Sequence, residues 1–173
     1  MLHGLWVVIP LLLQPVDRSR LPAPPARIFG DMLRFAEEGD LERVRRLLDV
    51  LAPVLAEHER VLGTTERADT TALVRSADRA EALRGVRRLV ARDIIVLLRS
   101  MQGASPDRMR TLLLTAGVEW RLVEPAVARE DVRSAQATSA RFRDLASAIG
   151  DRDVEGAGAL VRGVENDLRT ALR

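Results

Sequence analysis

Apolar residues recur with the 3.6-residue period of an amphipathic helix along nearly the whole chain from residue 27 onward. This pattern predicts helices over about 27–38, 41–62, 79–102, 106–130, 132–149 and 152–172, with a short helix inside the polar stretch 64–77. The sequence contains no alternating apolar and polar run bounded by turn dipeptides, which is the signature of strands. We therefore expect an all-α fold, an antiparallel helical bundle of about five to seven helices forming one domain at residues 27–173.

The longest predicted helix, which follows Ser105, is expected to organise this bundle. Ser105 and Pro106 form a helix-start signal, an N-cap residue followed by proline in the first turn. Glu119 and Glu124 flank the apolar face of this helix, roughly 140° apart around its axis. The apolar face comprises Met109, Leu112, Leu113, Ala116, Trp120, Val123 and Val127. Because Trp120 lies at the middle of the face, we expect it to anchor the core.

Residues 1–26 differ from the rest of the chain. An apolar run of nine residues, LWVVIPLLL at 5–13, precedes the proline-rich stretch LPAPPA at 21–26. Nine residues are too few to cross a bilayer but suit the apolar part of a signal peptide, for which residues 23–26 would supply the cleavage region. No Arg or Lys precedes the run, so a disordered tail or a packed N-terminal arm stays open as an alternative. Export implies a periplasmic or otherwise extracytoplasmic protein without a membrane span, whose residues 1–26 are dispensable for folding.

Charge and composition exclude several classes of function. All 27 basic residues are arginines, and with 25 acids the net charge is only +2. Basic and acidic residues alternate along the helices, so we expect no nucleic acid partner. The absence of cysteine excludes disulfides, thiolate catalysis and iron–sulfur clusters. No phosphate-binding glycine loop, nucleophile elbow or HExxH motif is present, so we expect no enzyme activity.

Two inward-facing polar residues carry the candidate chemistry. His58 lies on the apolar face of the predicted 41–62 helix, where it is either a hydrogen-bonded core residue or a ligand, while Glu57 and Glu59 point to the solvated flanks. Asp93 faces inward because its helical neighbours are Leu89, Val90, Val96 and Leu97. A buried carboxylate needs a partner, which is either an arginine of a facing helix or a bound cation.

Glu119, Glu124, Asp93 and His58 together form a candidate metal site. Helical bundles commonly hold metal ions on inward carboxylates and histidines contributed by several helices. At 1.5 Å per residue, Asp93 and Glu119 come within about one turn of each other in an antiparallel pair. His58 and Glu124 are nearly level if their helices run parallel. The Glu-x-x-His pair typical of di-iron bundles is absent, so the site is a constellation without a motif.

The segment EWRLVEPAVARED at 119–131 resembles a repeated segment in the extracytoplasmic helical region of bacterial high-affinity iron permeases. That segment has an aromatic residue, a Glu-Pro pair and a short Ala/Leu run ending in Arg-Asp. The stretch RFRDLASAI at 141–149 is similar to the following helix there, and the likeness covers about 105–172. The resemblance implies a role in handling iron and implicates Glu124, then Glu119 and Asp131. The chain lacks transmembrane helices and the Arg-Glu-Gly-x-Glu motif, so it is not the permease itself.

These patterns lead to two alternative functions. The first is an exported, non-enzymatic helical bundle, an accessory that binds iron or another divalent or trivalent metal ion, or that docks on a membrane transport protein. The alternative is a structural or protein-interaction bundle without a small ligand. Retention of a metal ion by protein purified without chelator separates the two.

Overall fold

The computed structural model of the protein describes residue 18 and residues 21–171, without the side chains of Glu66 and Val154. Within these residues the chain forms helices and no strands, which confirms the all-α prediction. The helices are α1 (Pro25–Glu38), α2 (Leu41–Val50), α3 (Ala52–Leu62), α4 (Thr64–Val74), α5 (Arg79–Arg99), α6 (Pro106–Glu130), α7 (Val132–Gly150) and α8 (Val154–Ala171). The apolar run at 5–13 lies outside the described residues.

One predicted helix is divided in two, which brings the number among the described residues to eight. The predicted helix over 41–62 breaks at Leu51, and Pro53 lies in the first turn of α3. Proline lacks the N–H that a helix interior requires, but it fits a first turn, where that group has no helical partner. The other boundaries agree with the sequence-based ranges to within three residues.

Polar side chains cap the starts of four of the helices, among them Ser105, which the sequence predicted as a helix start. A backbone N–H in the first turn of a helix has no partner within the helix, and an Asp or Ser side chain at the N-cap supplies one. The four N-cap residues are Asp40 of α2, Asp78 of α5, Ser105 of α6 and Asp131 of α7. Asp131, which the resemblance to iron permeases implicates in iron handling, therefore has a structural role at the start of α7.

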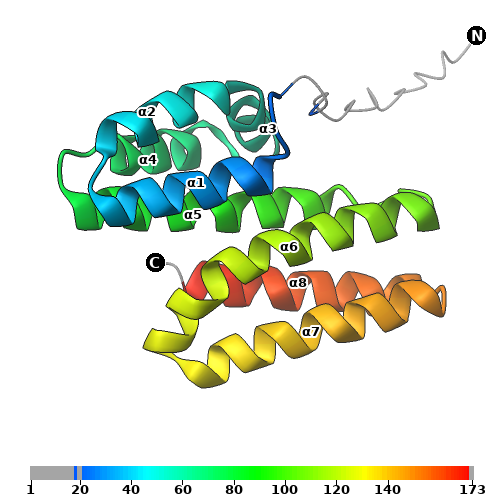
Figure 1. Cartoon of the computed structure of the whole chain (residues 1–173). Helices are drawn as coiled ribbons and strands as arrows, with labels where there is room; N and C mark the ends of the chain where they lie inside the picture. The colour runs from blue at the N-terminus through cyan, green and yellow to red at the C-terminus, as the bar shows by residue number, and fades with distance from the viewer. Residues whose placement is uncertain (1–17, 19–20, 172–173) are drawn as a thin grey trace, which may run out of the picture.

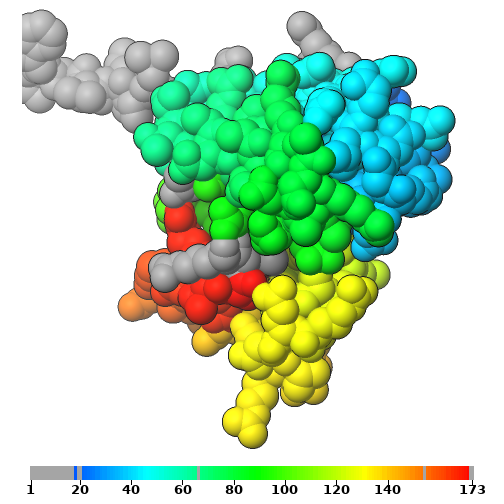
Figure 2. Space-filling model, turned by 90° about the vertical axis from the view of Figure 1, so that its left-hand side faces the viewer, coloured from blue at the N-terminus to red at the C-terminus, as the bar shows by residue number. Residues whose placement is uncertain are grey.

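Helix α5 is the centre of the fold, a place that the sequence analysis assigned to α6. It contacts α1, α3, α4, α6 and α8, and more than half of its 21 residues are buried. Figure 1 shows α1–α4 above α5, with α6 crossing below it and the α7/α8 pair beneath. In the perpendicular view, helices α2–α5 (cyan to green) lie over the ends of α6–α8 (yellow to red) (Figure 2). No helix in the described part of the chain is both long and apolar enough to span a membrane.

The segment before α1 contacts the helical body. Leu21 and Ala23 are partly buried against the core, and Pro25, the first residue of α1, is fully buried. The Leu21 N–H donates a hydrogen bond to the carbonyl oxygen of Arg18 at 3.3 Å. These contacts join residues before position 26 to the helical body. The predicted domain boundary at residue 26 stays a prediction.

Helices α4 and α5 approach most closely at a glycine, and we expect Gly85→Ala to lower the free energy of unfolding by about 1–3 kcal/mol. A Cβ atom at Gly85 would lie 2.5 Å from the backbone nitrogen of Val74 and 2.8 Å from the carbonyl carbon of Leu73. Backbone atoms cannot rotate away as a side chain can, so α4 would have to move. Urea unfolding followed by circular dichroism measures the change.

The matched control is Gly117→Ala in α6, where an added Cβ meets no atom within 4 Å. Alanine there should raise the free energy of unfolding by about 0.5–1 kcal/mol, because glycine loses more backbone entropy on entering a helix. Equal effects at the two positions would contradict the close packing of α4 on α5.

Candidate functional site

Charged side chains from three helices and from the segment before α1 meet at one buried place. Glu57 and His58 lie on α3, Asp93 in the middle of α5 and Glu119 in α6, and each is at most 3% exposed. Arg18 joins them from the N-terminal side. We call these five residues the Asp93 cluster.

One guanidinium group bridges two carboxylates of the cluster. The Nη1 and Nη2 atoms of Arg18 donate to the two oxygens of Asp93 at 2.8 and 2.7 Å. Its Nε and Nη2 atoms donate to Oε2 of Glu57 at 3.0 and 2.8 Å. This forked pairing is the geometry in which arginine binds carboxylates most strongly. Asp93 therefore has an arginine partner, supplied by the N-terminal segment and not by a facing helix.

His58 is a further hydrogen-bond partner of Asp93. Its Nε2 atom lies 2.8 Å from Oδ1 of Asp93. Burial by itself would raise the pKa of Asp93, but the hydrogen bond from His58 and the positive charge of Arg18 outweigh it and hold the pKa well below its ordinary value. Because an ionised carboxylate can only accept hydrogen bonds, Nε2 of His58 carries the proton and donates it.

Glu119 lies in the cluster beside Asp93, to which its protonated form can donate a hydrogen bond. Both of its carboxyl oxygens are buried, and neither has a donor within hydrogen-bonding geometry. Burial raises the pKa of Glu119 well above its ordinary value, and the nearby negative charge of Asp93 raises it further, while the charge of Arg18 offsets part of the effect. Glu119 therefore favours its neutral form, which can donate a hydrogen bond.

We expect Glu119→Gln to stabilise the protein at neutral pH, because glutamine is neutral in both the folded and the unfolded chain. In the unfolded wild type Glu119 ionises near pH 4.5, whereas the folded protein holds this proton to higher pH. The stability linked to this proton is thus complete below about pH 4.5 and is lost as the pH rises toward the folded pKa. The extra stability of Glu119→Gln over the wild type should grow across that pH range. It reaches about 1.4 kcal/mol for each tenfold difference between the acid dissociation constants of Glu119 in the folded and unfolded chain.

Urea unfolding of the wild type and Glu119→Gln at pH 4 and pH 7 tests this expectation. Glu130→Gln, at an exposed position near the end of the same helix, is the control and should show no such widening. An advantage of Glu119→Gln that is the same at both pH values would contradict a raised pKa.

Glu124 lies apart from the cluster and is directed to α7. Ser139 of α7 donates a hydrogen bond to Glu124 Oε1 at 2.6 Å and accepts one from the indole N–H of Trp120 at 2.8 Å. The ring of Trp120 stacks on Phe142, with centroids 6.2 Å apart. Trp120 is 4% exposed, which confirms its predicted place in the core. Of the four predicted site residues, the structure brings Asp93, His58 and Glu119 together and places Glu124 elsewhere.

Two members of the cluster were missed by the sequence analysis. Glu57 was expected on a solvated flank, and it is buried. The buried face of 41–62 keeps its helical period across the break, and Glu57 on its flank is buried because Arg18 bonds to it. Arg18 carries no local signal, and only the need of Asp93 for a cation pointed to a partner of this kind.

The cluster holds a guanidinium group between two of its acids. No three His, Asp or Glu side chains among the described residues converge closely enough to bind a metal ion. Arg18 takes the place that a cation would have next to Asp93 and Glu57. The acids are thus available to another cation only when Arg18 leaves.

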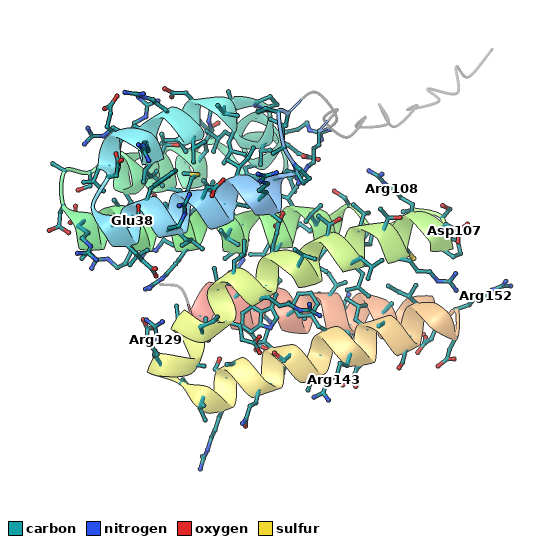
Figure 3. The ribbon with its side chains drawn as sticks, in the orientation of Figure 1. Glu38, Asp107, Arg108, Arg129, Arg143 and Arg152 are labelled. Atoms are coloured by element: carbon teal, nitrogen blue, oxygen red, sulfur yellow. The ribbon has the colours of Figure 1, made fainter. Side chains whose placement is uncertain are left out.

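An apolar pocket of about 180 Å³ lies where α5 ends and α6 begins. Its walls come from four helices and comprise Leu98, Met101, Gln102, Gly103, Met109, Leu145, Ile149, Ala157, Gly158 and Val161. Charged residues at this end of the molecule, Asp107, Arg108 and Arg152, point away from the helices (Figure 3). The pocket walls contain no titratable group, so the pocket offers shape but no charge.

The Asp93 cluster is consequently the part of the described chain best suited to hold a ligand by charge. It combines three acids and a histidine with Arg18 in a buried setting, and Arg60 lies 3.7 Å from Glu57 at its edge. Beyond this geometry, no protein-family model, no curated protein and no solved structure matches the chain.

Proposed function

We propose that this protein is a non-enzymatic helical bundle that binds a hard metal ion through the acids of the Asp93 cluster. The supporting observation is the carboxyl group of Glu119, which is fully buried beside Asp93, receives no hydrogen bond from any donor, and bonds to Asp93 only as a protonated acid. Two buried carboxyl groups side by side are costly to ionise together, and a cation between them would offset that cost. Carboxylate oxygens and imidazole nitrogen are suitable ligands for iron and related ions.

The likeness of residues 119–131 to the helical region of iron permeases extends this proposal. It suggests that the ion is iron, that the protein acts outside the cytoplasm and that its partner is a membrane transport protein. Glu124 and Asp131 enter only through that likeness, since Glu124 accepts a hydrogen bond from Ser139 and Asp131 caps α7.

The second candidate is a structural or protein-interaction bundle without a small ligand. The pairing of Arg18 with both Asp93 and Glu57 favours it, because this arginine neutralises buried acids that would otherwise require an ion. In that case Glu119 is a neutral residue whose burial is tolerated by the rest of the core.

Metal analysis of protein purified without chelator, followed by thermal melts with Fe²⁺ under anaerobic conditions and with Zn²⁺, tests the proposal. An ion that binds only the folded protein raises the melting temperature with its concentration. Asp93→Asn and Glu119→Gln should abolish the rise, whereas Glu124→Gln should retain it, because Glu124 lies outside the cluster. If no ion raises the melting temperature, with or without Arg18 in place, the interaction bundle is the remaining candidate.

A further inference from the structure

The apolar pocket lies where two helical hairpins meet, one formed by α5 and α6 and the other by α7 and α8. The connections within both hairpins lie at the same end of the molecule, on the right in Figure 1. The first hairpin contributes Met101 and Met109 to the pocket walls. The second contributes Ile149 and Val161. Clefts between the helices of a bundle are common places for small ligands.

Small residues in the first turns of α8 leave this space unfilled. Ala157 and Gly158 line the pocket with a methyl group and with no side chain at all. The nearest contact of a Cβ atom added at Gly158 would be the guanidinium end of Arg162, at 3.8 Å. Close packing therefore does not require a glycine at this position, and the space beside it is open.

The volume of the pocket suits one aromatic ring. At about 180 Å³ it is slightly larger than an engineered apolar cavity of about 150 Å³ in another protein, which stays dry and binds benzene. It is smaller than the roughly 300 Å³ at which pockets for drug-sized ligands begin. A ligand within it is thus a single ring, either alone or as the end group of a larger molecule.

The chemistry of the walls selects the class of ring. Gln102 has the one polar side chain among the wall residues, so a charged group would enter without a partner, which is strongly unfavourable. Met101 is buried, and Met109 is partly buried against the core. Methionine sulfur contacts aromatic rings favourably, and the unbranched side chain adapts to the shape of what it covers. The walls therefore suit an aromatic ring without charge.

We propose that this pocket binds an uncharged aromatic ring of about the size of toluene, in contact with Met101 and Met109. The ring leaves water for apolar walls, and this transfer is the source of its affinity. The pocket shares no residue with the Asp93 cluster, so the inference is independent of the metal-binding proposal and either can fail without the other.

The methionines allow a direct test, because the chain has only four. Toluene is titrated into the full-length protein labelled with ¹³C in its methionine methyl groups, and NMR resonances are assigned by Met→Leu substitutions. Ring currents shift methyl groups that contact a bound ring. Met101 and Met109 should shift to saturation with a common Kd, whereas Met32, buried in α1 outside the pocket, should not move. No saturable shift at Met101 and Met109, or an equal shift at Met32, would overturn the inference.

Two further compounds test the class of ligand in the same titration. Benzoate has the ring of toluene with a carboxylate, and it should bind at least about tenfold more weakly because its charge finds no partner in the walls. Hexan-1-ol, an alkyl chain with as many non-hydrogen atoms as toluene, should also bind more weakly, since it has no ring to contact the two sulfur atoms. Benzoate or hexanol binding as tightly as toluene would overturn the assignment to an uncharged ring.

A substitution that fills the pocket locates the ligand. Ala157→Leu adds an isopropyl group at a wall residue that is 7% exposed, and it should weaken toluene binding by at least about tenfold. Ala137→Leu, at an exposed position of α7, is the matched control and should bind toluene as the wild type does. If circular dichroism shows that Ala157→Leu does not fold, Val161→Ile takes its place, adding one methyl group to the wall. A folded pocket-filling variant with unchanged affinity would overturn the inference, because toluene would then bind elsewhere.

Discussion

Asp93→Asn is expected to lower the free energy of unfolding at pH 7 by about 3 kcal/mol, the lower end of the range for breaking a buried ion pair. Asparagine has the shape of aspartate but no charge, so Arg18 would lose one of its two carboxylate partners and His58 its charged acceptor. The lower end applies because Arg18 keeps its bonds to Glu57. Loss of the Asp93 charge also relieves the repulsion that raises the pKa of Glu119.

The destabilisation by Asp93→Asn should shrink in acid. The pKa of Asp93 is lower in the folded protein than in the unfolded chain, so its contribution is present above the unfolded value of about 3.9 and is lost as the pH falls toward the folded value. Urea unfolding at pH 7 and pH 3 measures the difference. Asp144→Asn, at an exposed position of α7, is the control and should stay within about 0.5 kcal/mol of the wild type. An unchanged gap at pH 3 would mean that the substitution acts through packing and not through charge.

Trp120→Ala is expected to cost about 3–5 kcal/mol, the range for removing a large aromatic side chain from a core. The indole ring fills the space between α6 and α7 and stacks on Phe142, so its removal leaves a cavity there. Guanidinium unfolding followed by circular dichroism measures the loss without relying on tryptophan fluorescence. A cost below about 1 kcal/mol would show that the ring is not packed as the structure describes.

Trp120→Phe separates packing from hydrogen bonding at the same position. Phenylalanine keeps most of the ring contact but cannot donate to Ser139, so the expected cost is about 1 kcal/mol. A cost as large as that of alanine would assign most of the effect to the polar group formed by Trp120, Ser139 and Glu124.

Local interactions made most of the helices predictable. The 3.6-residue apolar period and N-cap residues such as Asp78 and Ser105 act within a few residues of chain, so the sequence expresses them directly. Prolines were harder to interpret. Pro53 lies at the start of a helix, whereas Pro125 lies inside α6, which continues through it. Whether a proline begins a helix or lies inside one depends on the packing of the whole helix and not on the proline alone.

The approach of Asp93 to Glu119 was predictable for a similar reason. The two residues lie on consecutive helices joined by a short connection, so their positions along the chain determine their relative heights. The same estimate of height along the helix axis was wrong for Glu124, which was predicted to lie level with His58. The roughly 140° between Glu119 and Glu124 turns one toward α5 and the other toward α7, and only the packing of α7 shows where Glu124 finds its partner.

The sequence by itself thus determined the helices, the inward direction of Asp93 and its need for a positive partner. Tertiary structure decided which partner it has, because Arg18 lies 75 residues away, before the helical sequence pattern begins, where no local rule predicts a contact. It also decided the burial of Glu57, since Arg18 bonds to a side chain that the helical period alone places on a flank. Helix formation depends on neighbours within one turn, whereas a buried ionic cluster depends on how separate helices and segments dock, and that information is distributed over the whole chain.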